Sequence, residues 1–234
     1  IVFAPRLDFG RAATRLTPQP DGLEIEGASD PFVLYSPGIA WRIAEHGRHQ
    51  TAEATIQLNP GAPQLFELRS GTRNLKPPIL PEPERRAQTS RFWRNWAASL
   101  TLPALQPDMV RRSALVIKAL VHGPSGAIAA AATTSLPEVL GGTRNWDYRF
   151  CWPRDAALSA AALVRLGNTG HAMRLLDWLL AVVDSCESPD RLRPIYTVSG
   201  AELGAEAEIG ELSGYAASRP VRVGNAAAQQ VQLD

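Results

Sequence analysis

The densest group of chemically useful side chains lies in residues 141–156. Four aromatic residues are spaced by two in this segment: Trp146, Tyr148, Phe150 and Trp152. Side chains two apart point to the same side of an extended chain, so these rings are expected to share one face. Asp147 and Arg149 occupy alternate positions. The segment therefore predicts an extended stretch with aromatic and charged sides.

A helix is expected to begin at Pro153, which places Arg154 and Asp155 in its first turn. Sugar rings suit such a group, because their C–H faces pack on aromatic rings and their hydroxyls hydrogen-bond to carboxylates and guanidinium groups. Arg154 and Asp155 could grip one ring, with Trp152 beside them. The alternative is an aromatic strand packed into the core, with Asp155 stabilising the N-terminus of the helix. The pattern alone leaves both interpretations open.

A second group of candidate ligand-binding residues lies in residues 214–225. Arg219 and Arg222 straddle Pro220 shortly before another expected helix, and Tyr215 is close in sequence. One interpretation is a rigid loop that offers fixed hydrogen-bond donors. The other is a solvated basic turn, and the segment taken by itself favours that second interpretation.

Acidic residues that could serve as a general acid or base cluster on one loop: Glu202, Glu206, Glu208 and Glu211. A glycosidase needs one protonated and one ionised carboxyl group on opposite sides of the scissile bond. The loop could supply one of them, although such a run is more often a solvated loop. His46 and His49 lack a third ligand at a suitable spacing and are expected at the surface, so no metal site is predicted.

The elements that must position these groups differ between the two parts of the chain. In the first 80 residues, short apolar stretches alternate with turn signals. Strands are expected at residues 22–26, 32–35, 54–58 and 65–68, with turns at 36–38 and 59–61. These features predict an antiparallel sheet arranged as a sandwich.

From Pro81 onward the spacing of apolar residues is helical. Helices are expected over residues 84–100, 107–122, 153–166 and 170–186. The fourth is apolar around most of its circumference, which predicts burial on several sides. Asn225 is expected to cap a further helix over residues 226–233. Helices joined by long loops indicate an all-helical domain whose function resides in the loops.

Composition excludes several classes of partner. The 24 basic and 23 acidic residues give a formal charge of +1, so no broad positive field attracts nucleic acid or an anionic membrane. The apolar runs are far shorter than the roughly 20 residues of a membrane span. Phosphate-loop and dinucleotide-binding motifs are absent, and no cofactor is expected. Cys151 and Cys186 have no metal-binding or redox spacing, which favours a cytoplasmic location.

Residues 141–155 resemble the early catalytic-domain motif of glycoside hydrolase family 15 from bacteria and archaea. That family contains glucoamylases, glucodextranases and trehalases. Residues 219–227 are similar to its next motif, and residues 114–120 followed by 130–138 fit the order expected between the linker and the first pocket loop. The resemblance covers roughly residues 81–234.

The resemblance implies an N-terminal antiparallel β-sandwich followed by an (α/α)6 barrel. The corresponding division is a sandwich at residues 1–80, a linker with a helix at 81–106 and the first part of the barrel at 107–234. Both domains are expected to be incomplete, since the chain opens without methionine and stops within the expected helix at 226–233. The remainder of the same polypeptide is then expected to be required for stability.

The resemblance also implies an inverting α-glucoside hydrolase that releases β-glucose from the non-reducing ends of α-glucans or from trehalose. Trp152, Arg154 and Asp155 match residues that hold the terminal glucose. Other positions that match the motifs or lie beside them are Arg219, Arg222, Tyr215, Trp146 and Asp147. The family's general acid and base are glutamates further along the barrel, so no catalytic residue is assigned in this chain.

Two other functions remain open at this stage. One is a non-catalytic sugar-binding or scaffold protein of the same fold, which kept the pocket and lost the acid and base. The other is a related (α/α)6 phosphorylase. In every case the expected partner is an oligosaccharide or disaccharide.

Overall fold

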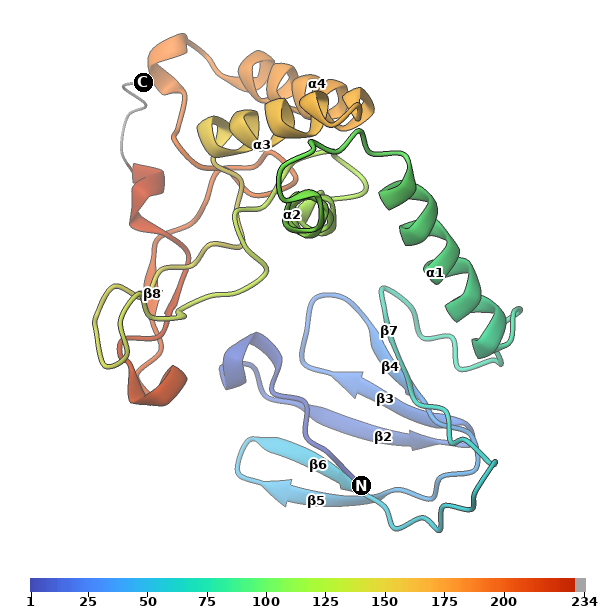
Figure 1. Ribbon diagram of the computed structural model, residues 1–234. Helices are drawn as coiled ribbons and strands as arrows, with labels where there is room; N and C mark the ends of the chain where they lie inside the picture. Colours follow the sequence, from blue (N-terminus) through green and yellow to red (C-terminus); the bar gives the residue numbers. More distant parts are fainter. Residues whose placement is uncertain (230–234) are drawn as a thin grey trace. The chain divides into compact units, whose positions relative to one another are not determined.

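The computed structural model describes residues 1–229 (Figure 1). The chain divides into two compact units, with the boundary between Arg85 and Arg86. We call residues 1–85 the β unit and the residues from 86 onward the helical unit, and each is described by itself.

The strands of the β unit form two antiparallel sheets. One sheet has the order β1-β6-β5, with β1 at Val2–Phe3, β6 at His49–Glu53 and β5 at Arg42–His46. The other has the order β2-β3-β4-β7, with β2 at Arg15–Gln19, β3 at Gly22–Glu26, β4 at Phe32–Tyr35 and β7 at Glu67–Ser70. A short 3-10 helix, Leu7–Gly10, follows β1.

The two sheets share one apolar core, so the predicted sandwich is confirmed. Leu23 and Ile25 of β3 are buried together with Ala52 of β6. The alternation of Leu23, Glu24 and Ile25 directs the apolar side chains inward, as the period of two requires. Pro18 lies within β2, which is an edge strand and therefore tolerates a residue without an N–H group.

The strand predictions succeeded where a pairing partner exists. The strands at 22–26 and 32–35 are confirmed, and the one at 65–68 begins two residues later, at Glu67. The strand predicted at 54–58 is wrong. Glu53 pairs with Arg42, the first residue of β5, so the residues after Glu53 have no β5 backbone opposite them.

All four predicted helices of the helical unit are present. They are α1 at Glu82–Ala98, α2 at Pro107–Leu120, α3 at Pro153–Arg165 and α4 at Thr169–Ser185. The unit boundary falls after the first four residues of α1. Proline starts α2 and α3, where the missing N–H costs nothing. Within residues 1–229, none of the helices combines the length and apolar character needed to cross a bilayer.

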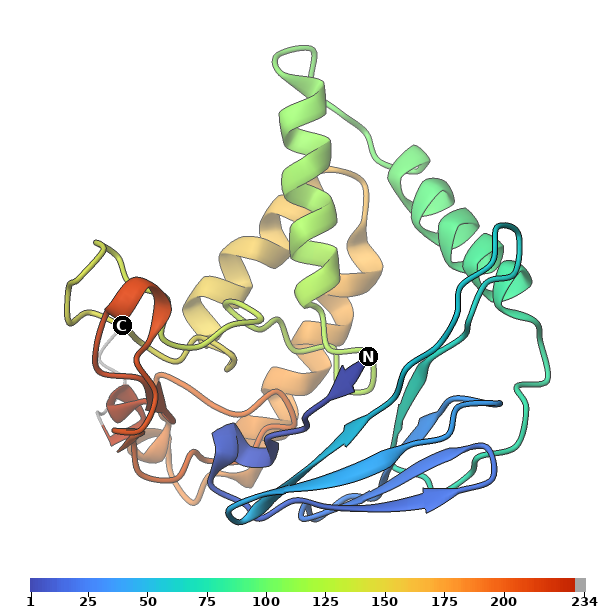
Figure 2. The same cartoon turned by 90° about the horizontal axis from the view of Figure 1, so that it is seen from below.

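Helices α3 and α4 form an antiparallel hairpin (Figure 2). Gly167 adopts a left-handed φ of 83° after α3, and its N–H donates to the carbonyl of Val164 at 2.9 Å. The last turn of α4 therefore lies at the same end as the first turn of α3. At that end, Cys151 and Tyr196 exchange backbone hydrogen bonds of 2.9 and 3.0 Å.

The prediction that α4 is buried on several sides is wrong for the described residues. Leu175, Trp178 and Val182 are buried on one face. Met173, Leu176, Leu180 and Val183 are each more than two-fifths exposed. Helix α4 therefore carries more apolar side chains than the elements packed against it within residues 1–229 can cover.

The segment after Asn225 is only partly described. Ala226–Gln229 forms a 3-10 helix, and the side-chain oxygen of Asn225 accepts a hydrogen bond from the N–H of Ala227 at 3.0 Å. Asn225 is therefore a cap, as predicted. Residues 230–233 of the predicted helix lie outside the described residues.

Candidate functional site

The extended segment before α3 has two sides, but the charged residue is on the inside. Asn145, Asp147 and Cys151 are fully buried. Tyr148, at an alternating position, is 37% exposed, and its ring centroid lies 5.7 Å from that of Trp152. The pattern argues against an aromatic strand packed into the core, because the buried side carries an amide and a carboxylate.

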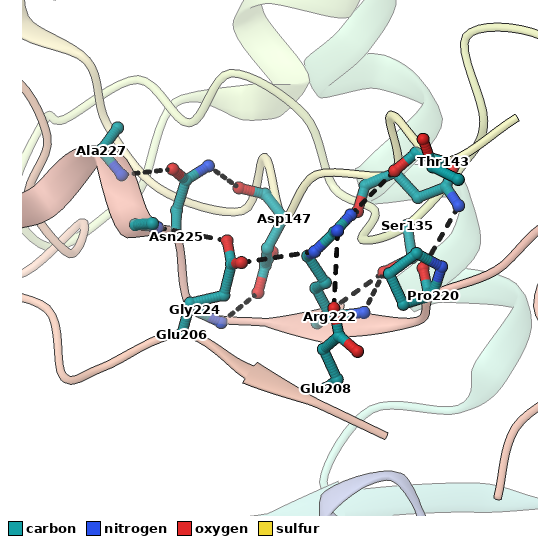
Figure 3. Close-up of polar contacts among 12 residues, drawn as sticks. Ser135, Thr143, Asp147, Glu206, Glu208, Pro220, Arg222, Gly224, Asn225 and Ala227 are labelled. Atoms are coloured by element: carbon teal, nitrogen blue, oxygen red, sulfur yellow. Dashed lines mark hydrogen bonds and ion pairs between the residues drawn. The ribbon is translucent and has the colours of Figure 1, made fainter. Parts of the chain in front are cut away.

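The buried carboxylate of Asp147 is surrounded by hydrogen-bond donors. Arg149 forms a two-pronged ion pair with it, donating from Nε at 2.8 Å and from Nη2 at 2.6 Å. The N–H of Gly224 donates to Oδ2 at 3.1 Å (Figure 3). Asn225 donates from Nδ2 to the carbonyl oxygen of Asp147 at 3.2 Å. These contacts join two segments that lie 77 and 78 residues apart in sequence.

Arg222 makes a second set of contacts between the same segments. It lies in the short strand β9, Arg222–Val223, which pairs with β8, Ala207–Glu208. Its guanidinium lies 3.3 Å from a carboxylate oxygen of Glu206 and 3.5 Å from one of Glu208. It donates to the carbonyl of Thr143 at 2.9 Å, and its central carbon lies 4.7 Å from the ring centroid of Trp146. Arg222 is therefore engaged by protein groups on several sides.

Three further residues, which the sequence did not single out, tie these segments together. Asn145 donates from Nδ2 to the carbonyl of Pro220 at 3.2 Å. The hydroxyl of Ser135 accepts from the N–H of Arg222 at 2.7 Å, and that of Ser218 accepts from the N–H of Gly141 at 2.8 Å. Uncharged polar residues in loops are common, so their types alone gave no signal.

The residues at the start of α3 are placed differently. Arg154 and Asp155 project from the first turn with 61% and 55% of their side chains exposed, and Nε lies 3.6 Å from Oδ2. Trp152 immediately precedes the helix. Trp152 and Asp155 also line a cavity of about 300 Å³, together with Ile117 and Ala156. This group offers solvent-facing polar atoms beside an aromatic ring.

Arg219 and Tyr215 lie at the surface of residues 214–225, the second segment. Arg219 is exposed and donates to the carbonyl of Gly210 at 3.2 Å. Arg219 and Arg222 line a cavity of about 360 Å³ with Glu208 and Thr143. Tyr215 is 61% exposed, in the 3-10 helix Tyr215–Ala217. The structure thus brings Trp146 and Arg222 into contact and binds Asp147 to Gly224 and Asn225. Arg219 lines the same cavity as Arg222.

The acidic loop is partly structural. Glu206, with 18% of its side chain exposed, contacts Arg222 and accepts a hydrogen bond from the N–H of Ala226 at 3.2 Å. Glu208 is exposed, although it also contacts Arg222. Glu202 and Glu211 are exposed. The interpretation of a wholly solvated loop is therefore wrong for Glu206.

Neither the Cys151 thiol nor the pair His46 and His49 forms a reactive site. Burial raises the pKa of the Cys151 thiol to about 11, so it is protonated at neutral pH and a poor nucleophile. His46 is exposed, as predicted, but His49 is half-buried and its Nδ1 lies 3.4 Å from the hydroxyl of Thr14. Among residues 1–229, no group of three His, Cys, Asp or Glu side chains could hold a metal ion.

Comparison with known families accounts for both units. A model described as trehalase-like, N-terminal, matches residues 1–93, and a model described as glycosyl hydrolases family 15 matches residues 104–234. The chain belongs to glycoside hydrolase family 15. Antiparallel sheets followed by four helices fit a sandwich and the first part of the family 15 barrel.

Several relatives carry the name trehalase. Trehalase 1 of Sulfolobus acidocaldarius is 52% identical over 127 residues, which are 54% of this chain and 23% of the relative. The trehalase of Thermoplasma acidophilum is 40% identical over 64% of this chain and 25% of its own length. The trehalase of Mycobacterium tuberculosis is 35% identical over 97% of this chain and 32% of its own length. No solved structure matches.

The chain therefore spans about a quarter to a third of the length of these relatives. It is a trehalase-like region of a glycoside hydrolase family, and its family implies a sugar as substrate.

Proposed function

We propose that this chain carries the glucose-holding part of the active site of an inverting α-glucoside hydrolase, with trehalose as its first candidate substrate. The observation that carries the proposal is the exposed pair of Arg154 and Asp155 beside Trp152, in a segment inside the family 15 match. Similarity to proteins named trehalase extends through both units, which favours trehalose over α-glucans.

The proposed role of this group is to orient one glucose ring. Trp152 offers an aromatic surface for the C–H face of the sugar, while Arg154 and Asp155 offer charged hydrogen-bond partners for neighbouring hydroxyls. Arg219 and Tyr215, which are exposed on the second segment, are proposed as further contacts. Fixing the ring in this way lowers the entropic part of the barrier for attack at the anomeric carbon.

The chemical step needs two carboxyl groups in addition. In an inverting hydrolase, one protonates the leaving oxygen and the other activates water on the opposite face, at a separation of about 6.5–9.5 Å. The family's catalytic glutamates are expected outside residues 1–234. The proposed contribution of this chain is therefore binding and orientation of the sugar.

Proton NMR of the anomeric signals tests the proposal. The polypeptide in which this chain occurs would be incubated with trehalose and, separately, with maltotriose. Inversion predicts that trehalose gives equal amounts of α- and β-glucose at early times, because only one of its two anomeric carbons is attacked. Maltotriose cleaved with inversion would give early β-glucose. Two molecules of α-glucose from trehalose would contradict inversion.

The same measurement separates the other functions. Release of glucose only when inorganic phosphate is present, with formation of a glucose phosphate, would indicate a phosphorylase. Broadening of trehalose signals without any product would indicate a sugar-binding protein. Either result would contradict the proposed hydrolysis.

A further inference from the structure

We propose that Asp147 is a positioning residue of this site, which fixes the second segment against the segment that leads into α3. The inference rests on the proposed function, because it assigns a role within the same sugar-binding site. Asp147 would act through other residues and not by touching the sugar.

The burial and bonding of its carboxylate support this role. The side chain has no exposed surface. Oδ1 accepts from the N–H of Arg149 at 3.2 Å and from its Nε at 2.8 Å. Oδ2 accepts from Nη2 of Arg149 at 2.6 Å and from the N–H of Gly224 at 3.1 Å. With both oxygens occupied by protein donors inside the unit, a sugar hydroxyl has no access to this carboxylate.

The backbone of Asp147 makes a further hydrogen bond to the second segment. Its carbonyl oxygen accepts from Nδ2 of Asn225, and the side chain of Asn225 in turn caps the following 3-10 helix. The two neighbouring residues Gly224 and Asn225 are thus held by one residue of the other segment (Figure 3). Both the course of the chain and the orientation of the cap depend on Asp147.

Gly224 allows the close approach that this arrangement needs. It adopts a left-handed φ of 78°, and a Cβ atom added to it would lie 3.1 Å from the carbonyl oxygen of Ala205. The left-handed conformation aims its N–H at Asp147, and only glycine adopts it without strain. The turn at Gly224 therefore favours the contact with Asp147 over other arrangements.

The residues proposed to bind sugar lie on both sides of this connection. Trp152, Arg154 and Asp155 follow Asp147 by five to eight positions, and Arg219 precedes Gly224 by five. Loss of the carboxylate would leave each side chain intact but remove the hydrogen bond from Gly224, one of the links that hold the second segment against the first. The expected consequence is a misplaced Arg219, and small displacements of such groups reduce rates strongly.

The first experiment measures kcat and KM for trehalose and maltotriose in the polypeptide that contains this chain, comparing wild type with Asp147→Asn. The asparagine keeps the shape but removes the charge and replaces one acceptor with a donor. At temperatures where both proteins are folded, kcat/KM is expected to fall by about 10- to 100-fold. Asp108→Asn is the matched control, since Asp108 is also paired with an arginine but is 90% exposed, and it should leave kcat/KM unchanged.

A double-mutant cycle distinguishes positioning from a general loss of stability. Arg219→Ala is measured alone and together with Asp147→Asn. If Asp147 acts by placing Arg219, the loss caused by Arg219→Ala is expected to be clearly smaller in the Asp147→Asn protein. Equal losses in the two backgrounds, or an unchanged kcat/KM in folded Asp147→Asn, would overturn the positioning role.

Amide hydrogen exchange supplies a readout that does not need turnover. Asp147→Asn is expected to speed exchange at residues 222–225 while the amides of α3 stay protected. If wild-type protein cleaved neither sugar, the proposed function would fail, and unchanged exchange at 222–225 would then overturn this inference as well. Should Asp147→Asn not fold, Asn225→Asp keeps the acceptor for the N–H of Ala227 but replaces the donor to the Asp147 carbonyl with a carboxylate oxygen. It is expected to change exchange and kcat/KM in the same direction, and no change would contradict the proposal.

Discussion

The two units differ in which polar residues they bury. Among residues 1–229, the buried polar side chains of the β unit are hydroxyls: Thr14, Ser36 and Thr51. Those of the helical unit include a carboxylate and two amides, and all lie outside the α-helices: Ser135, Asn145, Asp147, Ser218 and Asn225. The β unit thus has an ordinary apolar interior, whereas the loops of the helical unit enclose a polar network.

The reason lies in how each region satisfies its backbone. Strands pair with strands, so the sheets of the β unit meet their hydrogen-bonding requirement with main-chain groups. Long loops have no such ladder, and their carbonyl and N–H groups bond to side chains such as Asn145 and Ser135. A loop held in this way has one defined shape, which a binding site requires. Buried polar side chains therefore mark the loops of the helical unit that are held in a defined shape.

The largest expected effect tests whether function is confined to the helical unit. Asp155→Ala is expected to lower kcat/KM for the cleaved sugar by about 1000-fold, because a charged contact to the sugar ring is lost. Stability should change by less than about 1 kcal/mol, since the side chain is more than half exposed. The control is Glu45→Gln in the β unit, also more than half exposed. Steady-state kinetics that show equal effects for the two variants would remove Asp155 from the site.

The second prediction concerns the apolar interiors, which we expect to be equally important in the two units. Leu23 and Leu163 are both fully buried. Replacing either with alanine is expected to cost about 3 kcal/mol, through lost burial and a residual cavity. Hydrogen exchange would show the loss of protection in the β unit for Leu23→Ala and in the helical unit for Leu163→Ala. Leu58→Ala, at a 68% exposed position, is the control and should have little effect.

A smaller effect on the free energy of unfolding should distinguish the buried amides of the helical unit from the buried hydroxyls of the β unit. Asn225→Ala is expected to cost about 2 kcal/mol, because the cap of Ala227 and the donor to Asp147 are both lost. Thr51→Val in the β unit should cost about 1 kcal/mol, since only the acceptor for Arg6 is removed. Chemical denaturation measures both. Equal costs would contradict the idea that polar contacts matter more in the helical unit.

The smallest expected effect is a difference in acid sensitivity. Two opposing effects act on the pKa of the Glu67 carboxyl in the β unit. Burial raises this pKa, but hydrogen bonds from Arg85 and Arg69 together lower it by more, so the pKa lies below its ordinary value of 4.5. Such a group stabilises the folded state above pH 4.5, and the contribution is lost as the pH falls through the lower folded pKa. Glu67→Gln should therefore destabilise the β unit at neutral pH and much less in strong acid.

The helical unit should respond at a higher pH. Burial, with Lys118 and Arg174 nearby, lowers the pKa of His171 from its ordinary value of 6.5. The unfolded chain then binds a proton before the folded one, so stability is lost as the pH falls below about 6.5. Denaturation of each unit, measured from pH 7 down into strong acid, checks the order. Loss of stability in the β unit before the helical unit would contradict it.

Local signals predicted the helices well and the strands less well. Pro107 and Pro153 mark helix starts, and Gly167 marks an end, because each residue limits the backbone by itself. The strand expected at 54–58 had suitable alternation, but the pairing with β5 ends at Arg42 and Glu53. A strand needs a second backbone, which an isolated stretch of sequence does not contain.

For the candidate site, the sequence by itself determined which side chains could do chemistry and where they lie along the chain. The alternation of aromatic and charged residues before Pro153, and the two arginines around Pro220, required no structure. Only the tertiary structure decided that Asp147 is inside, that Arg222 is held by Glu206 and Trp146, and that Asp155 faces solvent. The physical reason is that burial of a charge depends on the donors around it, and the donor at Gly224 lies 77 residues away.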